Sequence, residues 1–159
     1  MGQHSPRRVQ WGASKLHFTF DIPEGEQRFR ELILYVSQKC ATDAKFGATK
    51  LNKILYYADF KAFGRFGKPI TGFEYQRERN GPVPKRLLPV REEMIRRGEL
   101  ALQPVELASG YIQKRTVNLR EPHLDVFTPE QIALIDSIID TLWGYTAEEV
   151  SDLSHQMVG

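Results

Sequence analysis

The side chains that could do chemistry are few and scattered. The sequence has no GxxxxGKS or GxxxxGKT phosphate loop, no GxSxG nucleophile motif, no HExxH zinc motif and no CxxC pair. Two acid–histidine pairs remain, His123 with Asp125 and Asp152 with His155. The second pair is spaced i, i+3, so its carboxylate could orient the imidazole on a helix face. No nucleophile accompanies either pair, which favours hydrogen bonding or capping. We expect a non-enzyme with no catalytic residues, no metal site and no cofactor.

Asp59 is the one acidic residue within 48–63 and stands beside Tyr56 and Phe63 on the flank of a largely apolar helix. A carboxylate that is buried in such a position needs a partner. We expect a buried or half-buried ion pair with Arg77 or Arg79, which would lock this run to the strand that follows it.

Basic side chains are concentrated between residues 77 and 97, where they outnumber acidic ones by seven to three. Such a segment can bind the phosphates of a nucleic acid or an acidic protein surface. The sequence has no helix-turn-helix or zinc-finger spacing, which favours the protein surface over nucleic acid. The candidate partner-binding residues are Arg77, Arg79, Lys85, Arg86, Arg91, Arg96 and Arg97.

The charge of the whole chain is nearly balanced but unevenly distributed. The net charge is +2, yet residues 121–159 hold eight acids and no Lys or Arg, so the first 120 residues carry +10. This asymmetry indicates either a basic binding face or two halves that attract each other on folding. Cys40 is the one cysteine, expected as a buried thiol in a reducing compartment. No apolar run approaches the roughly 20 residues of a membrane span, and no signal-peptide core is evident, so we expect a cytoplasmic protein with no membrane partner.

The first half of the chain shows three periodic segments. Residues 1–14 lack apolar periodicity and are expected to form a mobile arm, whereas residues 16–22 alternate as a half-buried strand does. Apolar residues at helical spacing predict a helix from about 25 to 41. A second helix, 48–63, is apolar on two sides, which predicts a central position in the fold.

The second half is rich in turn and capping signals. Gly81, Pro82 and Pro84 predict a stiff turn after a short strand centred on Phe73 and Tyr75. A helix that Pro89 opens and Gly98 closes follows, then a hairpin at 99–119 with Pro104 on an edge strand. Thr128 and Thr146 each begin a capping box before a late helix. The prediction is an α+β, mostly helical single domain, with about five helices around the helix at 48–63 and a small antiparallel sheet that includes the hairpin.

Four stretches occur in an order that resembles the Panacea domain, the family of SocA-like antitoxins. They are KLNKILYYADF (50–60), GKPITGFEY (67–75), NGPVP (80–84) and TAEEVSDLSH (146–155). The resemblance covers about residues 26–155, so we divide the chain into an N-terminal arm and strand, 1–25, and a Panacea-like domain, 26–159. It implies that the following residues form the scaffold signature: Leu51, Lys53, Leu55, Tyr56, Asp59, Gly81, Pro82, Val83 and His155.

This resemblance implies an antitoxin that neutralises a cognate protein toxin by direct contact, without catalysis. An adaptor that delivers a partner to a protease, or a DNA-binding regulator that uses the basic 77–97 segment, are the alternatives. Stable binding needs a patch of about 800 Å² on each partner. The candidate surfaces, in order of preference, are the basic segment, the 99–119 hairpin and the open edge of the strand at 16–22.

Overall fold

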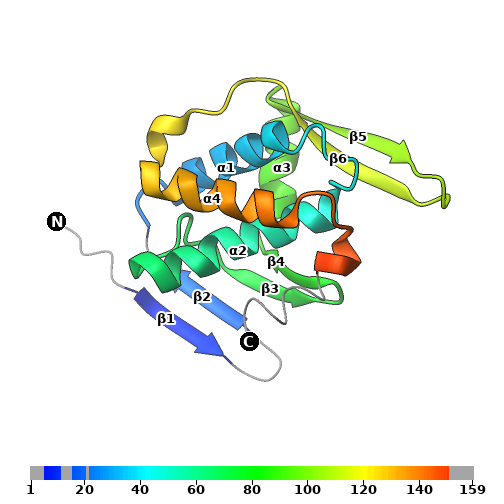
Figure 1. Cartoon of the computed structure of the whole chain (residues 1–159). Coiled ribbons are helices and arrows are strands. Elements are labelled where there is room, and N and C mark those ends of the chain that lie inside the picture. The colour runs from blue at the N-terminus through cyan, green and yellow to red at the C-terminus, as the bar shows by residue number, and fades with distance from the viewer. Residues whose placement is uncertain (1–5, 12–15, 21, 151–159) are drawn as a thin grey trace.

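The computed structural model describes residues 6–11, 16–20 and 22–150. These residues form an α+β fold of four α-helices, a further helical segment at 147–150 after Thr146, one 3-10 helix and three two-stranded antiparallel sheets, which is the predicted class (Figure 1). None of these helices has the length and apolar character needed to cross a membrane. The elements are β1 (Pro6–Trp11), β2 (Leu16–Phe20), α1 (Gly25–Lys39), α2 (Ala48–Phe66), β3 (Tyr75–Glu78), β4 (Gly81–Pro84), α3 (Leu87–Arg96), β5 (Leu100–Glu106), β6 (Ile112–Asn118), η1 (Leu124–Val126) and α4 (Pro129–Leu142).

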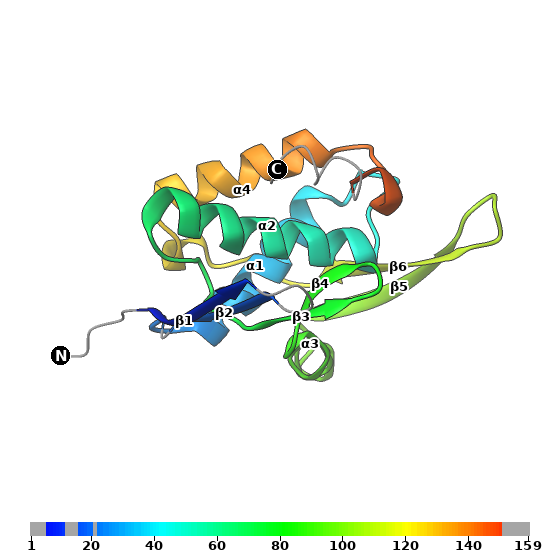
Figure 2. The ribbon, with the colours of Figure 1, turned by 90° about the horizontal axis from the view of Figure 1, so that it is seen from below.

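Helix α2 lies at the centre of the fold, as its two apolar sides predict. It contacts α4, α1, β4 and β6 (Figures 1 and 2). Ile54, Leu55 and Ala58 are fully buried, and Tyr56 and Tyr57 are buried beside them. Burying each large aliphatic side chain contributes roughly 1.5–3 kcal/mol of hydrophobic free energy, so tertiary packing rather than helix propensity holds α2 in place.

The helices that flank α2 begin and pack as their sequences predict. In α1, Phe29, Leu32, Ile33 and Val36 are fully buried. Helix α4 begins with the predicted capping box. The Thr128 hydroxyl accepts from the Gln131 N–H at 3.1 Å, and the Gln131 side chain accepts from the Thr128 N–H at 2.9 Å. Such a cap contributes about 1 kcal/mol.

The stretch GPVP is a strand rather than only a bend. It pairs with β3, with Tyr75 opposite Pro84 and Glu78 opposite Gly81. The Lys85 N–H donates to the Glu74 carbonyl at 2.9 Å, so residue 85 faces β3 with its backbone groups. In an antiparallel pair, residues that do so alternate with residues whose backbone groups point away. Pro82 and Pro84 are of the second kind, and their nitrogens point away from β3. Neither proline therefore removes a bond of the ladder, which is why a strand accepts both.

Helix α3 begins at Leu87, two residues before the predicted start at Pro89, so Pro89 is its third residue. A first-turn nitrogen has no carbonyl partner within the helix, so the proline removes no hydrogen bond there. Leu87, Val90 and Met94 are buried, as predicted. Gly98, at φ +75°, ends this segment, and the following N–H donates to the Met94 carbonyl at 2.9 Å.

Strands β5 and β6 form the predicted hairpin, which extends from the body of the molecule (Figures 1 and 2). Its loop includes Gly110 at φ +88°. At the N-terminus the prediction of a mobile arm is wrong for Pro6–Trp11, because this segment pairs with Leu16–Phe20 as β1. Strand β2 thus pairs with β1 along one edge and lies near β3, but among the described residues no strand is hydrogen-bonded to its other edge, so the use of that edge in binding stays a prediction.

Candidate functional site

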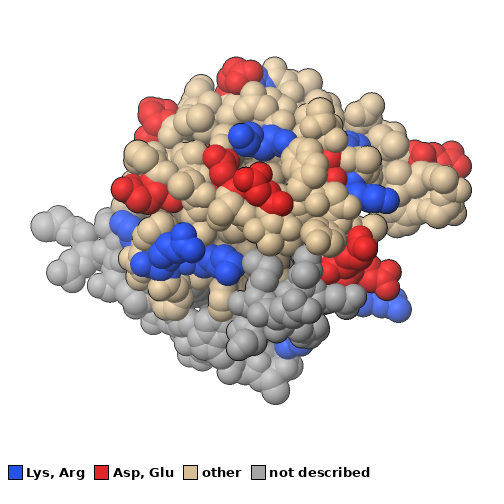
Figure 3. All heavy atoms as spheres, viewed as in Figure 1, with Lys and Arg blue, Asp and Glu red and all other residues tan. Residues whose placement is uncertain are grey.

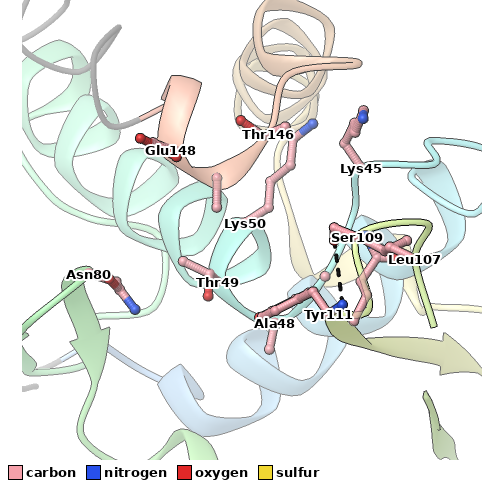
Figure 4. A pocket seen from close by; sticks show the side chains of 13 residues that line it. Lys45, Ala48, Thr49, Lys50, Asn80, Leu107, Ser109, Tyr111, Thr146 and Glu148 are labelled. Atoms are coloured by element: carbon pink, nitrogen blue, oxygen red, sulfur yellow. Dashed lines mark hydrogen bonds between the residues drawn. The ribbon is translucent and has the colours of Figure 1, made fainter. Parts of the chain in front are cut away.

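A cavity of about 560 Å³ opens where four segments of the chain meet. These are the start of α2, the β3–β4 turn, the tip of the β5–β6 hairpin and the turn that follows α4 (Figure 4). The lining residues are Lys45, Gly47, Ala48, Thr49, Lys50, Asn80, Leu107, Ser109, Tyr111, Gln113, Thr146, Ala147 and Glu148.

Arg115 of β6 ties the hairpin to the loop between α1 and α2. One guanidinium nitrogen donates to the carbonyl oxygens of Asp43 at 2.9 Å and Phe46 at 2.7 Å. The other donates to those of Cys40 at 3.2 Å and Ala41 at 3.0 Å. Because the rigid planar fork serves four carbonyl groups at once, the hairpin wall of the cavity is fixed against residues 40–46. No local sequence pattern distinguishes this arginine from the others, so its role is not predictable from the sequence.

A buried ion pair fixes the opposite wall. Lys50 Nζ lies 2.6 Å from Asp43 Oδ2, and both side chains are only 1% exposed. Lys50 also donates to the Tyr145 carbonyl at 2.9 Å, while Asp43 accepts from the N–H groups of Lys45 and Gly144. Burial alone would raise the pKa of Asp43, but Lys50 and these hydrogen bonds bring it below its ordinary value. The pair thereby holds the turn after α4 against the start of α2.

Lys53 fixes the β3–β4 turn. Its buried Nζ donates to the Asn80 carbonyl at 2.7 Å, and burial lowers the pKa of Lys53. Gly81 follows at φ +117°, and a Cβ atom there would lie only 2.9 Å from this nitrogen. Glycine is therefore favoured both by the backbone conformation and by the close approach of the lysine.

The family comparison matches residues 51–157 to a model described as "Antitoxin SocA-like, Panacea domain". The chain belongs to this family. Comparisons with curated proteins and with solved structures give no match. The matched region begins within α2, later than the start near residue 26 that the resemblance suggested, and the division into 1–25 and 26–159 stays a prediction.

The Panacea signature residues that the structure describes are mainly internal. Leu51, Leu55 and Tyr56 are core side chains of α2, and Pro82 and Val83 are half-buried in β4. Lys53 and Gly81 meet at the β3–β4 turn, as shown above. His155, together with Asp152, lies outside the described residues.

Asp59 of the Panacea signature is fully buried, but the predicted ion pair with Arg77 or Arg79 is wrong. Its carboxylate accepts from the N–H groups of Ile70 and Thr71, both at 2.8 Å, and from the hydroxyls of Thr71 at 2.5 Å and Tyr75 at 2.8 Å. Uncharged donors thus satisfy both oxygens without burial of a guanidinium, which would add its own desolvation cost. Burial raises the pKa of Asp59, and the four hydrogen bonds oppose that rise. The expected link between α2 and the following strand does exist, through Tyr75.

The seven basic residues of the 77–97 segment do not line the cavity. Six are exposed and Arg91 is half-buried. Lys85 pairs with Glu74 at 3.1 Å, and Arg86 pairs with Glu26 at 2.8 Å. Their role in partner binding stays a prediction, but two of the charges are already compensated within the fold.

A second candidate surface is the outer face of α3, which we define as Leu88, Arg91, Glu92, Ile95 and Arg96. Leu88 is 58% exposed and Ile95 38%. They lie on a different side of the helix from the buried Val90 and Met94. Figure 3 shows the other side of the molecule, where basic side chains gather over the end of α2 and acidic ones over α4.

Of the two acid–histidine pairs, the structure describes His123 and Asp125. Glu31, rather than Asp125, is the carboxylate beside His123, accepting from its backbone N–H at 2.7 Å. Burial alone would raise the pKa of Glu31, but two hydrogen bonds from Arg120 and this N–H bring it below its ordinary value. Within residues 6–11, 16–20 and 22–150, no three His, Cys, Asp or Glu side chains gather as metal ligands would.

Proposed function

We propose that this protein is an antitoxin that neutralises a cognate protein toxin by direct binding. The observation that carries the proposal is the match of residues 51–157 to the SocA-like antitoxin family. The proposed action takes place in the cytoplasm, by masking the toxin and without catalysis.

The internal roles of the signature residues support a binding function. Asp59 and Lys53 are used to join α2 to the β3–β4 region, and Leu51, Leu55 and Tyr56 are used in the core. A scaffold held in this way presents surfaces with little conformational entropy left to lose on binding, which favours affinity.

Co-expression with the product of the neighbouring open reading frame tests the proposal. We expect that product to arrest growth alone, and this chain to restore growth and to copurify with it. An Asp59→Ala variant, which should be strongly destabilised, is the negative control. A product that is harmless alone, or that stays toxic beside this chain, would contradict the proposal.

Two further measurements separate masking from the alternatives. If this chain delivered its partner to a protease, the half-life of the partner would shorten in its presence, whereas masking leaves the half-life unchanged or longer. If it acted as a DNA-binding regulator, it would retard duplex DNA in a gel at low salt, where phosphate contacts are strongest. We expect an unshortened half-life and no retardation.

A further inference from the structure

Among the residues that the structure describes, helix α3 is covered on one side only. Its buried residues pack toward β5 and α1, and Figure 2 shows the helix at the border of the molecule. Leu88 and Ile95 are both exposed and stand seven residues, or about two helical turns, apart, as two apolar side chains on one stripe. Apolar side chains that share a helix face with arginines are typical of protein interfaces, whose cores are enriched in arginine and apolar contacts.

The charge around this stripe is mainly positive. Glu92 is the one acid on the outer face, and Arg91 and Arg96 lie on either side of it with Arg97 at the end of the helix. Among the described residues, Arg96 and Arg97 form no ion pair, whereas Arg86 at the start of the helix is bound to Glu26. The C-terminal half of α3 therefore offers uncompensated guanidinium groups, and the N-terminal end does not.

We propose that the outer face of α3 is the toxin-docking surface, and that it binds a toxin patch in which acidic side chains surround an apolar centre. This proposal rests on the proposed antitoxin function. Leu88 and Ile95 supply the apolar contact, and Arg96, on the same outer face, pairs with a toxin carboxylate. A ten-residue helix is about 15 Å long, so α3 forms the centre of the interface and neighbouring residues complete it.

The experiment measures the affinity of each variant for the neighbouring-frame toxin, and the expression level at which it restores growth. We expect Arg96→Glu and Leu88→Ser each to weaken the complex by about ten-fold or more, without a change in melting temperature. The matched controls are Lys114→Glu, an exposed basic residue on the hairpin, and Leu119→Ser, whose side chain is 55% exposed. Both controls should bind as the wild type does.

Salt dependence tests the charge chemistry separately. The wild-type complex should weaken as salt is raised, and the complex of Arg96→Glu should weaken less, because it has lost one of the pairs that salt screens. Lys85→Ala should have little effect on toxin binding, since Lys85 already has Glu74 as its partner.

Different failures are distinguishable. If the wild type neither rescues growth nor copurifies with the toxin, the antitoxin function fails and the docking surface with it. If the wild type rescues but both α3 variants bind the toxin equally well, the docking surface alone is wrong. Loss of binding in the cavity variant Tyr111→Ala together with retention in the α3 variants would place the toxin at the cavity instead. A wild-type chain that binds duplex DNA through Arg96 with no effect on the toxin would also overturn the inference.

Discussion

Replacement of Asp59 by alanine is expected to remove most of the stability of this fold. In the variant, the Ile70 N–H, the Thr71 N–H and the Thr71 hydroxyl lose their acceptor at a site closed to water. The Tyr75 hydroxyl keeps a partner, since it also lies 2.9 Å from the Leu55 carbonyl oxygen. Each buried donor left unpaired costs about 1–3 kcal/mol, so the three together cost about 3–9 kcal/mol. Domains of this size are typically stable by only about 5–15 kcal/mol.

The companion variant Asp59→Asn separates loss of hydrogen bonds from loss of charge. Its amide oxygen still accepts from both N–H groups, and its NH₂ group donates to a hydroxyl oxygen, so we expect a loss of only about 1–2 kcal/mol. Urea unfolding followed by circular dichroism measures both values. Asp140→Ala, at an exposed position on α4, should stay within about 0.5 kcal/mol of the wild type. A cost for Asp59→Ala below about 1 kcal/mol, or equal costs for the two Asp59 variants, would refute the reasoning.

Three other predictions concern the walls of the cavity. Arg115→Lys should lower the free energy of unfolding by about 2–3 kcal/mol and speed hydrogen exchange in residues 41–46, because one ammonium group cannot serve four carbonyl oxygens. Unchanged exchange would count against the role of Arg115 in holding these residues. The folded pKa of Asp43 lies below its ordinary value of 3.8, so its contribution to stability is complete above about pH 4 and is lost as pH falls through the folded pKa. Asp43→Asn should therefore be less stable than the wild type at neutral pH and lose less on acidification, and parallel pH profiles of unfolding free energy would contradict this. Burial raises the pKa of Cys40 to about 12, so a thiol reagent should react with the protein only after unfolding; rapid labelling of the native protein would show the thiol to be accessible.

Elements whose signals lie within a few residues of one another are predictable from the sequence. The Thr128 capping box, the Gly98 helix end and the loop at Gly110 each depend on backbone conformations or hydrogen bonds that span three or four residues. The central position of α2 is predictable for a related reason, since a helix that is apolar on two sides must be covered on two sides. The family signature makes residues that are far apart in the chain predictable as parts of one domain, because its motifs occur together in the family.

The partners of buried polar groups are decided only by the tertiary structure. Asp59 lies near several donors in the sequence, but the fold places Thr71 and Tyr75 against it and leaves Arg77 and Arg79 outside. Arg115 is an ordinary hairpin arginine until the chain brings residues 40–46 beside it, about 70 positions away. A buried polar group that is left without a hydrogen-bond partner destabilises the fold, and which groups can serve as partners depends on where the folded chain places them.

The same distinction applies to the candidate binding surfaces. The sequence alone determines that seven basic residues lie between 77 and 97 and that α3 has an apolar stripe directed to the core. Only the folded chain decides that Glu74 and Glu26 compensate Lys85 and Arg86, and that Leu88 and Ile95 remain uncovered. The physical reason is that charge pairing and burial depend on distances in space, which local composition does not specify until distant elements have packed together.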